Sequence, residues 1–163
     1  MSLFNGTYVQ NFDAKGRVSI PASFRAALRA GAVNPVPLSE GQVSIPLVLR
    51  PSEKANCVEA LTEMRHQALV AELDKLDPLS EAYDALATVL FADAWPVETD
   101  REGRVIVPET LLAHAGITRD GRVAFVGMGT RFQLWHPDNV SGRKAEARDA
   151  YRERIARQRE VAA

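Results

Sequence analysis

The chain has 163 residues, of which 46% are hydrophobic and 25% charged, so its composition is that of a folded globular domain rather than a disordered or collagen-like one. Twenty lysines and arginines are offset by 21 aspartates and glutamates, and this balance argues against a uniformly basic nucleic-acid binder. The single cysteine, Cys57, excludes a disulfide framework within the chain, and we expect an inert, partly buried thiol. We find no signal peptide and no run approaching the ~18 apolar residues of a membrane span, so we expect a cytoplasmic protein.

One short stretch occurs twice. Asp13 to Pro21 (DAKGRVSIP) returns as Asp100 to Pro108 (DREGRVIVP), at an offset of 100 − 13 = 87. Five of the nine positions are identical. The chain is therefore predicted to consist of two related halves, each too small to bury a core alone, which pair to share one.

The first half is predicted to form a strand, a tight turn, a second strand, a helix and then a hairpin. Asp followed by a small residue, Lys and Gly favours a turn, and β-branched residues favour a strand after it. Pro21 suits the first turn of a helix. The expected elements are a strand at 7–12, a strand at 17–20, a helix at 22–28 that ends near Gly31, and a strand at 45–49.

The middle of the chain is predicted to be helical. Ser52 is a candidate N-cap, and apolar residues recur after it at helical spacing. Asp77-Pro78 would break this helix, and a second helix would run to about Phe91. These helices would connect the two halves. The apolar positions are Val58, Leu61, Met64, Ala68, Leu69, Leu73 and Leu76.

The second half repeats the pattern and is followed by a tail. Its first strand, 94–99, contains Pro96, which suits a sheet edge. The segment 47–51 is similar in sequence to the segment 133–137, at an offset of 86. Asp138 is predicted to cap a last, arginine-rich helix to about Val161. That helix is either a solvated surface helix or a basic arm for DNA or a neighbouring subunit.

The repeated stretch carries the candidate site. An Asp in such a turn can accept hydrogen bonds from the turn amides and orient an Arg, and Gly supplies the positive φ. A hairpin tip with Arg and Lys can enter a major groove, where Arg binds guanine and Lys binds phosphate. From residue types alone, a purely structural role for the Asp–Arg pairs stays open. The turn-fixing candidates are Asp13, Gly16, Asp100 and Gly103, and the DNA-binding candidates are Lys15, Arg17, Arg25, Arg101 and Arg104.

The motif Asp-x-Lys-Gly-Arg-Val-x-Ile-Pro, present once in each half, resembles the MraZ family of bacterial transcription regulators. Each half is similar to the swapped-hairpin DNA-binding domain of AbrB and SpoVT, and 127–135 resembles the family's closing hairpin. The resemblance implies an α+β fold in which two swapped-hairpin repeats pair into a pseudo-two-fold β-barrel, with connecting helices and a C-terminal helix. The implied segments are a first repeat at 7–54, a helical connector at 55–93, a second repeat at 94–137 and a helical tail at 138–163.

The resemblance also implies a function. The protein would bind double-stranded DNA at repeated promoter elements, as a ring-shaped homo-oligomer associated with the nucleoid. It would repress the division and cell-wall gene cluster that contains its own gene. The second half departs from the motif, since Glu102 and Leu112 stand where Lys15 and Arg25 stand in the first half. We therefore expect unequal halves, with the first half making more of the base contacts.

Two other classes of function differ in how well they fit the sequence. An enzyme is not expected, because no catalytic signature is present and His66, His114 and His136 lack metal-ligand spacing. We accordingly expect no metal, cofactor, small-molecule substrate or membrane partner. An antitoxin-like module that clasps a partner protein through its C-terminal tail stays open, although a typical antitoxin has one motif copy and this chain has two.

Overall fold

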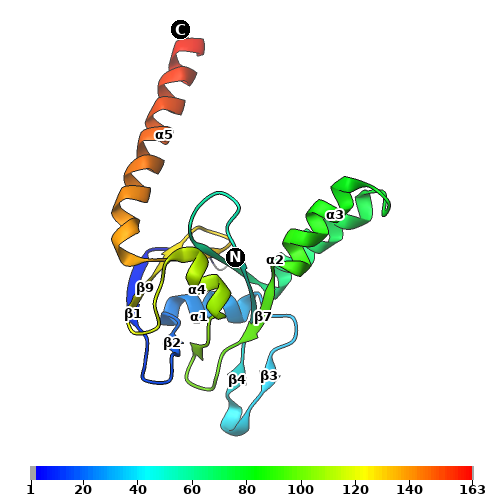
Figure 1. Cartoon of the computed structure of the whole chain (residues 1–163), viewed down its shortest axis with the longest axis vertical. Helices are drawn as coiled ribbons and strands as arrows, with labels where there is room; N and C mark the ends of the chain where they lie inside the picture. The colour runs from blue at the N-terminus through cyan, green and yellow to red at the C-terminus, as the bar shows by residue number, and fades with distance from the viewer. Residues whose placement is uncertain (1–2, 163) are drawn as a thin grey trace.

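The computed structural model describes residues 3–162. A six-stranded antiparallel sheet forms the body, and two helical segments project from it, the α2–α3 arm and the long helix α5 (Figure 1). In spatial order, the sheet contains β1 (Thr7–Asn11), β9 (Arg122–Gly127), β10 (Phe132–Trp135), β6 (Val58–Thr62), β5 (Pro46–Pro51) and β7 (Trp95–Glu98).

Two further sheets have two strands each. They are β2 (Val18–Ser19) with β8 (Arg104–Val105), and β3 (Val36–Pro37) with β4 (Val43–Ser44). The helical elements are α1 (Ala22–Ala30), η1 (Ser39–Gly41), α2 (Glu63–Ala71), η2 (Glu72–Lys75), α3 (Glu81–Ala87), η3 (Thr88–Ala92), α4 (Glu109–Ala115), η4 (Pro137–Asn139) and α5 (Val140–Ala162).

The first strand of each half pairs with a later strand of the other half. Strand β1 pairs with β9, with Thr7 opposite Val126, and β7 pairs with β5, with Glu98 opposite Pro46. The main sheet is continuous only because the halves exchange these strands. Neither half therefore contains its own complete set of backbone hydrogen-bond partners.

The strand registers are unchanged when the two halves are exchanged. Val18 lies opposite Val105, and 105 − 18 = 87 is the repeat offset itself. At the centre of the main sheet, Glu59 of β6 lies opposite Gln133 of β10. By these pairings β5 corresponds to β9 and β6 to β10. The expected match between 47–51 and 133–137 is therefore wrong.

The mixed α+β class and the C-terminal helix are confirmed, but the expected barrel is not formed. Strands β1 and β7 are the two edges of the main sheet, and the structure of residues 3–162 contains no pairing between them. Each is followed by a strand of only two residues, and these short strands pair with each other instead of bridging the edges. Pro96 within β7 also lacks the N–H that a further ladder would need.

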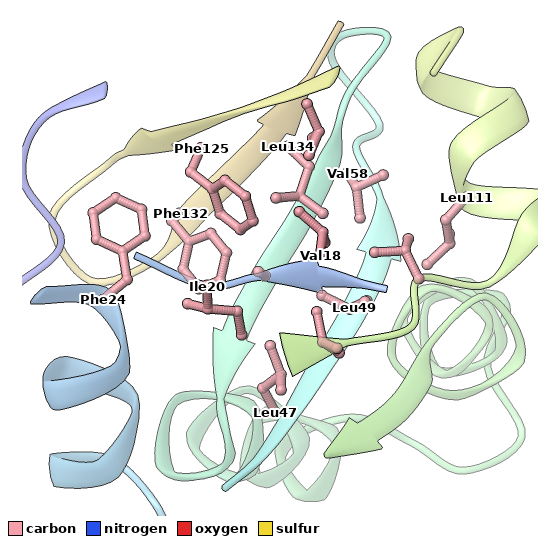
Figure 2. Close-up of a cluster of buried hydrophobic side chains, with 14 of the residues drawn as sticks. Val18, Ile20, Phe24, Leu47, Leu49, Val58, Leu111, Phe125, Phe132 and Leu134 are labelled. Atoms are coloured by element: carbon pink, nitrogen blue, oxygen red, sulfur yellow. The ribbon is translucent and has the colours of Figure 1, made fainter. Parts of the chain in front are cut away.

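Alternate residues of the repeated motif build the core. Val18 and Ile20 are each 1% exposed and point into a cluster that includes Phe24, Phe125 and Phe132 (Figure 2). The rings of Phe24 and Phe132 lie 5.1 Å apart. Because strand side chains alternate, burying the valine and isoleucine turns the intervening side chains outward. The core thus fixes the direction in which the motif presents its polar residues.

The helix expected from Ser52 does not begin there. Val58–Thr62 is the buried strand β6, and the helix α2 starts at Glu63, capped by the Thr62 hydroxyl, which accepts from the amide of Arg65 at 3.0 Å. An apolar run buried on both faces has no distinctive period, so helix and strand look alike in the sequence. Helices α2 and α3, with η2 and η3, then form the arm.

Helix α5 extends from the body for 23 residues and has no buried residue within 140–162. It follows the short turn η4, in which His136 Nδ1 accepts from the Asp138 amide at 3.1 Å, so the predicted cap at Asp138 is wrong. None of the helices found within residues 3–162 combines the length and the apolar character needed to cross a membrane.

Candidate nucleic-acid interface

The first turn is held by Asp13. Its Oδ1 accepts from the amides of Lys15 at 3.0 Å and Arg17 at 2.8 Å, and its Oδ2 accepts from Arg17 Nε at 2.8 Å. Gly16 has a φ of 76°, which L-residues with a side chain rarely adopt. One carboxylate therefore fixes both the turn and the direction of its arginine.

The second turn repeats this arrangement. Asp100 Oδ1 accepts from the amides of Glu102 and Arg104, both at 2.9 Å, and Oδ2 accepts from Arg104 Nε at 2.8 Å. Gly103 has a φ of 78°. The sequence repeat is thus a repeat of one hydrogen-bonded unit.

These contacts keep both carboxylates ionised. The backbone hydrogen bond from Arg17 is the main cause that lowers the pKa of Asp13. Burial raises the pKa of Asp100, but hydrogen bonds from the Arg104 amide and guanidinium outweigh it, so the net shift is downward. The same side-chain hydrogen bond raises the pKa of Arg104. Each Asp–Arg pair is therefore a stable ion pair near neutral pH.

The two turns lie side by side. Gly103 O accepts from the Ile20 amide at 3.0 Å, and Arg104 Nη1 lies 3.9 Å from Asp13 Oδ2. The loops that precede β2 and β8 point to the same end of the molecule as the β3–β4 hairpin (Figure 1). The pairing of β2 with β8 therefore merges the two turns into one polar end.

The two arginines differ in how far they are neutralised. Arg104 contacts Asp100, and its Nη2 also lies 3.0 Å from Glu102 Oε2. Arg17 is bonded to Asp13 through Nε, and within residues 3–162 neither of its Nη atoms makes a hydrogen bond. Lys15, which is exposed, stands at the position of Glu102. The first turn therefore carries the more available positive charge.

Arg25 and Arg119 brace the turns from the two halves. Arg25 Nη1 donates to Ile20 O at 2.6 Å, and Arg119 Nη2 donates to Val107 O at 2.5 Å. These carbonyl groups are equivalent in the repeat, since 107 − 20 = 87. Arg119 Nη1 also donates to Gly16 O at 3.0 Å, so it holds the first turn directly.

Arg119 was missed by the sequence reasoning. Its offset from Arg25 is 119 − 25 = 94, and the residue at the repeat offset is Leu112, which is 0% exposed in the core. Arg119 reaches the equivalent carbonyl from the loop after α4 rather than from the helix. A single sequence gives no signal for this, because the equivalence is spatial.

Arg101 lies on the exposed surface of the second turn. With Arg25 and Arg29 it lines an open depression of about 460 Å³, which Asp100 and Glu102 also line. The structure thus brings the five predicted DNA-binding residues to one end of the molecule, with acidic groups concentrated at the second turn.

The three histidines lie in separate parts of the structure. His136 is the cap described above, and His114 Nε2 lies 3.2 Å from Ala55 O. Burial lowers the pKa of His66, and the charge of Arg50 lowers it further. Over the described part of the chain, no group of three or more His, Cys, Asp or Glu residues could hold a metal ion.

The fold and the paired turns define an α+β protein of two related halves that presents a doubled Asp–Arg turn at one end of its sheet. The family model described as "MraZ protein, putative antitoxin-like" matches residues 3–34 and 90–158. The chain belongs to the MraZ family, whose named relatives are transcriptional regulators.

Three relatives illustrate the similarity, and each is named transcriptional regulator MraZ. The protein from Gluconacetobacter diazotrophicus is 47% identical over 94% of this chain and 90% of its own length. The protein from Gluconobacter oxydans is 46% identical over 93% of this chain and 87% of its own. The protein from Rickettsia bellii is 38% identical over 90% of each.

Proposed function

We propose that the protein is a sequence-specific DNA-binding repressor that reads promoter DNA with its two turns. Its targets would be repeated elements upstream of the division and cell-wall gene cluster that contains its own gene. Membership of a family of transcriptional regulators supports this proposal. It also fits the convergence of basic side chains on two adjacent turns.

One observation carries the proposal. Arg17 is anchored through Nε to Asp13 at 2.8 Å, while both Nη atoms make no hydrogen bond within the described residues. A guanidinium held through Nε alone keeps its Nη fork available for an external acceptor. That fork matches the O6 and N7 acceptors of guanine in a major groove. Lys15 beside it is suited to a backbone phosphate.

A near-neutral chain can still bind DNA tightly if several subunits contact the DNA at once. We propose that subunits assemble into a homo-oligomeric ring, so that several turn pairs engage repeated promoter elements at once. Linked weak contacts bind far more tightly than one contact. Light scattering coupled to size-exclusion chromatography tests the ring, and a plain monomer at working concentration would remove it.

The exchange of first strands supports the swapped-hairpin description of the two repeats. Strand β1 completes the sheet beside β9, and β7 does so beside β5. We retain the division into a first repeat, a connector, a second repeat and a tail as part of this proposal, although β6 of the connector lies at the centre of the sheet.

The decisive experiment is a fluorescence-anisotropy titration of the full chain into labelled DNA from upstream of its own gene cluster. Unrelated DNA serves as competitor, and Arg17→Ala is compared with Arg148→Ala, an exposed arginine on α5. We expect tight binding that Arg17→Ala weakens and Arg148→Ala keeps. No binding by the wild type at low salt would overturn the proposal.

A second candidate function rests on helix α5. A 23-residue helix with no buried residue is suited to clasping a partner protein, as in an antitoxin-like module. A deletion of the C-terminal helix distinguishes the two candidate functions. Deleting residues 146–163 would abolish partner capture under this alternative, whereas under the main proposal it would leave the Arg17-dependent DNA contact in place.

A further inference from the structure

A cavity of about 310 Å³ lies between the β5–β6 loop, helix α2 and the turn between β9 and β10. Four basic side chains line it against two carboxylates, a surplus of 4 − 2 = 2 positive charges. Like charges are unfavourable neighbours unless an anion is shared among them. The basic residues are Arg50, Lys54, Arg65 and Arg131, and the acidic ones are Glu53 and Glu59.

Glu59 is already fully engaged. Its Oε2 accepts from Arg131 Nε at 2.8 Å, and its Oε1 accepts from Gln133 Nε2 at 2.9 Å. Glu59 is itself 6% exposed. This pairing neutralises Arg131 and leaves only the exposed Glu53 to balance the remaining three basic groups.

Those three basic groups have no protein partner. Across residues 3–162, the side chains of Arg50, Lys54 and Arg65 form no hydrogen bond and no ion pair. The Nε atom of Arg50 is buried without any acceptor. A buried donor of this kind is rare in folded proteins, and an acceptor from outside the chain would satisfy it. The positive field extends to His66, whose pKa Arg50 helps to lower.

We propose that this cavity binds a phosphate group, as inorganic phosphate or as a small phosphate monoester. A phosphate carries close to two negative charges near neutral pH and has three strong acceptor oxygens. It therefore matches both the surplus charge and the forked donors of two arginines. The volume lies at the lower end of the range for small-molecule pockets, which suits such a ligand.

The position of the cavity separates it from the two turns. On β5, Pro46 pairs with Glu98, two residues before Asp100, whereas Arg50 lies four residues further along the strand. At ~3.3 Å per residue this is roughly 13 Å along β5. The loop after β5 lies at the opposite end of the body from the turns (Figure 1). This separation favours a free phosphate compound over a phosphate of the DNA held by the turns.

Calorimetric titration of the full chain with inorganic phosphate, at constant ionic strength maintained with chloride, tests the site. Wild type is compared with Arg50→Gln, Arg65→Gln and the control Arg148→Gln, an exposed arginine outside the cavity. We expect saturable binding by wild type and control, and at least tenfold weaker binding by the two cavity variants. No saturable binding by wild type, or equal affinity in all four proteins, overturns the proposal.

Two features keep the test decisive. Arg65 is exposed on α2 and its side chain makes no hydrogen bond in the described residues, so its variant should fold even if Arg50→Gln does not. Promoter binding by Arg65→Gln assigns the source of the phosphate. Unchanged DNA affinity supports a free ligand, and a loss as large as that of Arg17→Ala would overturn it. The phosphate result itself does not depend on DNA binding.

Discussion

Arg25 and Arg119 hold equivalent carbonyl groups from positions that are not equivalent in the repeat. Arg25 donates to Ile20 O from helix α1, and Arg119 donates to Val107 O from the loop after α4. Each also packs over the turn glycine of the other half, Gly103 and Gly16 respectively. The geometry of the two turns is therefore the same although the two supporting residues occupy different places in their halves.

The unequal neutralisation of the two motif arginines predicts unequal effects on DNA binding. Arg17→Ala should weaken binding to the promoter by about 1 to 3 kcal/mol, the worth of one bidentate base contact. Arg104→Ala should cost less, since Asp100 and Glu102 already occupy its guanidinium. Anisotropy titrations measure both losses, and thermal melting of each variant controls for folding. Equal losses would contradict the idea of unequal halves.

Salt should weaken promoter binding steeply, because phosphate contacts release bound counterions. Lys15 is exposed and forms no ion pair within residues 3–162, so Lys15→Gln should lower the slope of log affinity against log salt by about 1. The control is Lys75→Gln on the arm, where the lysine pairs with Glu72 at 3.0 Å. A slope that Lys15→Gln leaves unchanged would remove this lysine from the DNA contact.

Acid should destabilise the protein through the two turn carboxylates. The folded-state pKa of Asp13 and of Asp100 lies below the ordinary 3.8, so the stabilisation is complete above that pH and is lost as pH falls through the lowered pKa. Asp13→Asn with Asp100→Asn should lower the free energy of unfolding at pH 7 and flatten its decline toward pH ~2. Urea unfolding across this range measures the effect, and a decline as steep as in wild type would refute it.

The turn glycines should resist substitution. Gly103→Ala combines a φ of 78° with a Cβ that would lie 2.8 Å from Arg25 Nε, so we expect a loss of at least about 1 kcal/mol in unfolding free energy. Gly142→Ala on α5 is the matched control, because its Cβ would meet nothing within 4 Å and alanine favours a helix. Urea unfolding should therefore show destabilisation by the first and a neutral or stabilising effect of the second.

Local chemistry made much of the structure predictable. Pro21 and the residues after it indicated helix α1, and the Asp, Gly and Arg of the motif indicated a tight turn leading to a strand. The repeat at an offset of 87 indicated that two halves would combine, and the registers of β2 and β8 contain that same offset. These features depend on residues that are neighbours in the sequence, or on the sequence identity between the two copies of the motif.

Other features depend on contacts that no local pattern contains. The sequence of strand β6 does not distinguish strand from helix, because Val58, Ala60 and Leu61 are buried in the centre of the sheet, where an apolar run loses its alternation. The open sheet followed from the shortness of β2 and β8, which family resemblance does not specify. Arg119 lies at the site only because the fold brings the loop after α4 next to the first turn. Which residues complete a site from a distance is decided by packing, and one sequence does not reveal it.

The exchange of first strands affects how the protein can be oriented on DNA. Because both copies belong to one chain, and β1 and β7 each complete the other half, the two copies are always paired with each other. A symmetric pair made from two identical chains would bind a site that reads the same from either end. A pair of halves within one chain, with Lys15 in one turn and Glu102 in the other, is asymmetric. Under the proposed function it therefore binds non-palindromic DNA in one orientation, which suits successive sites that all point the same way.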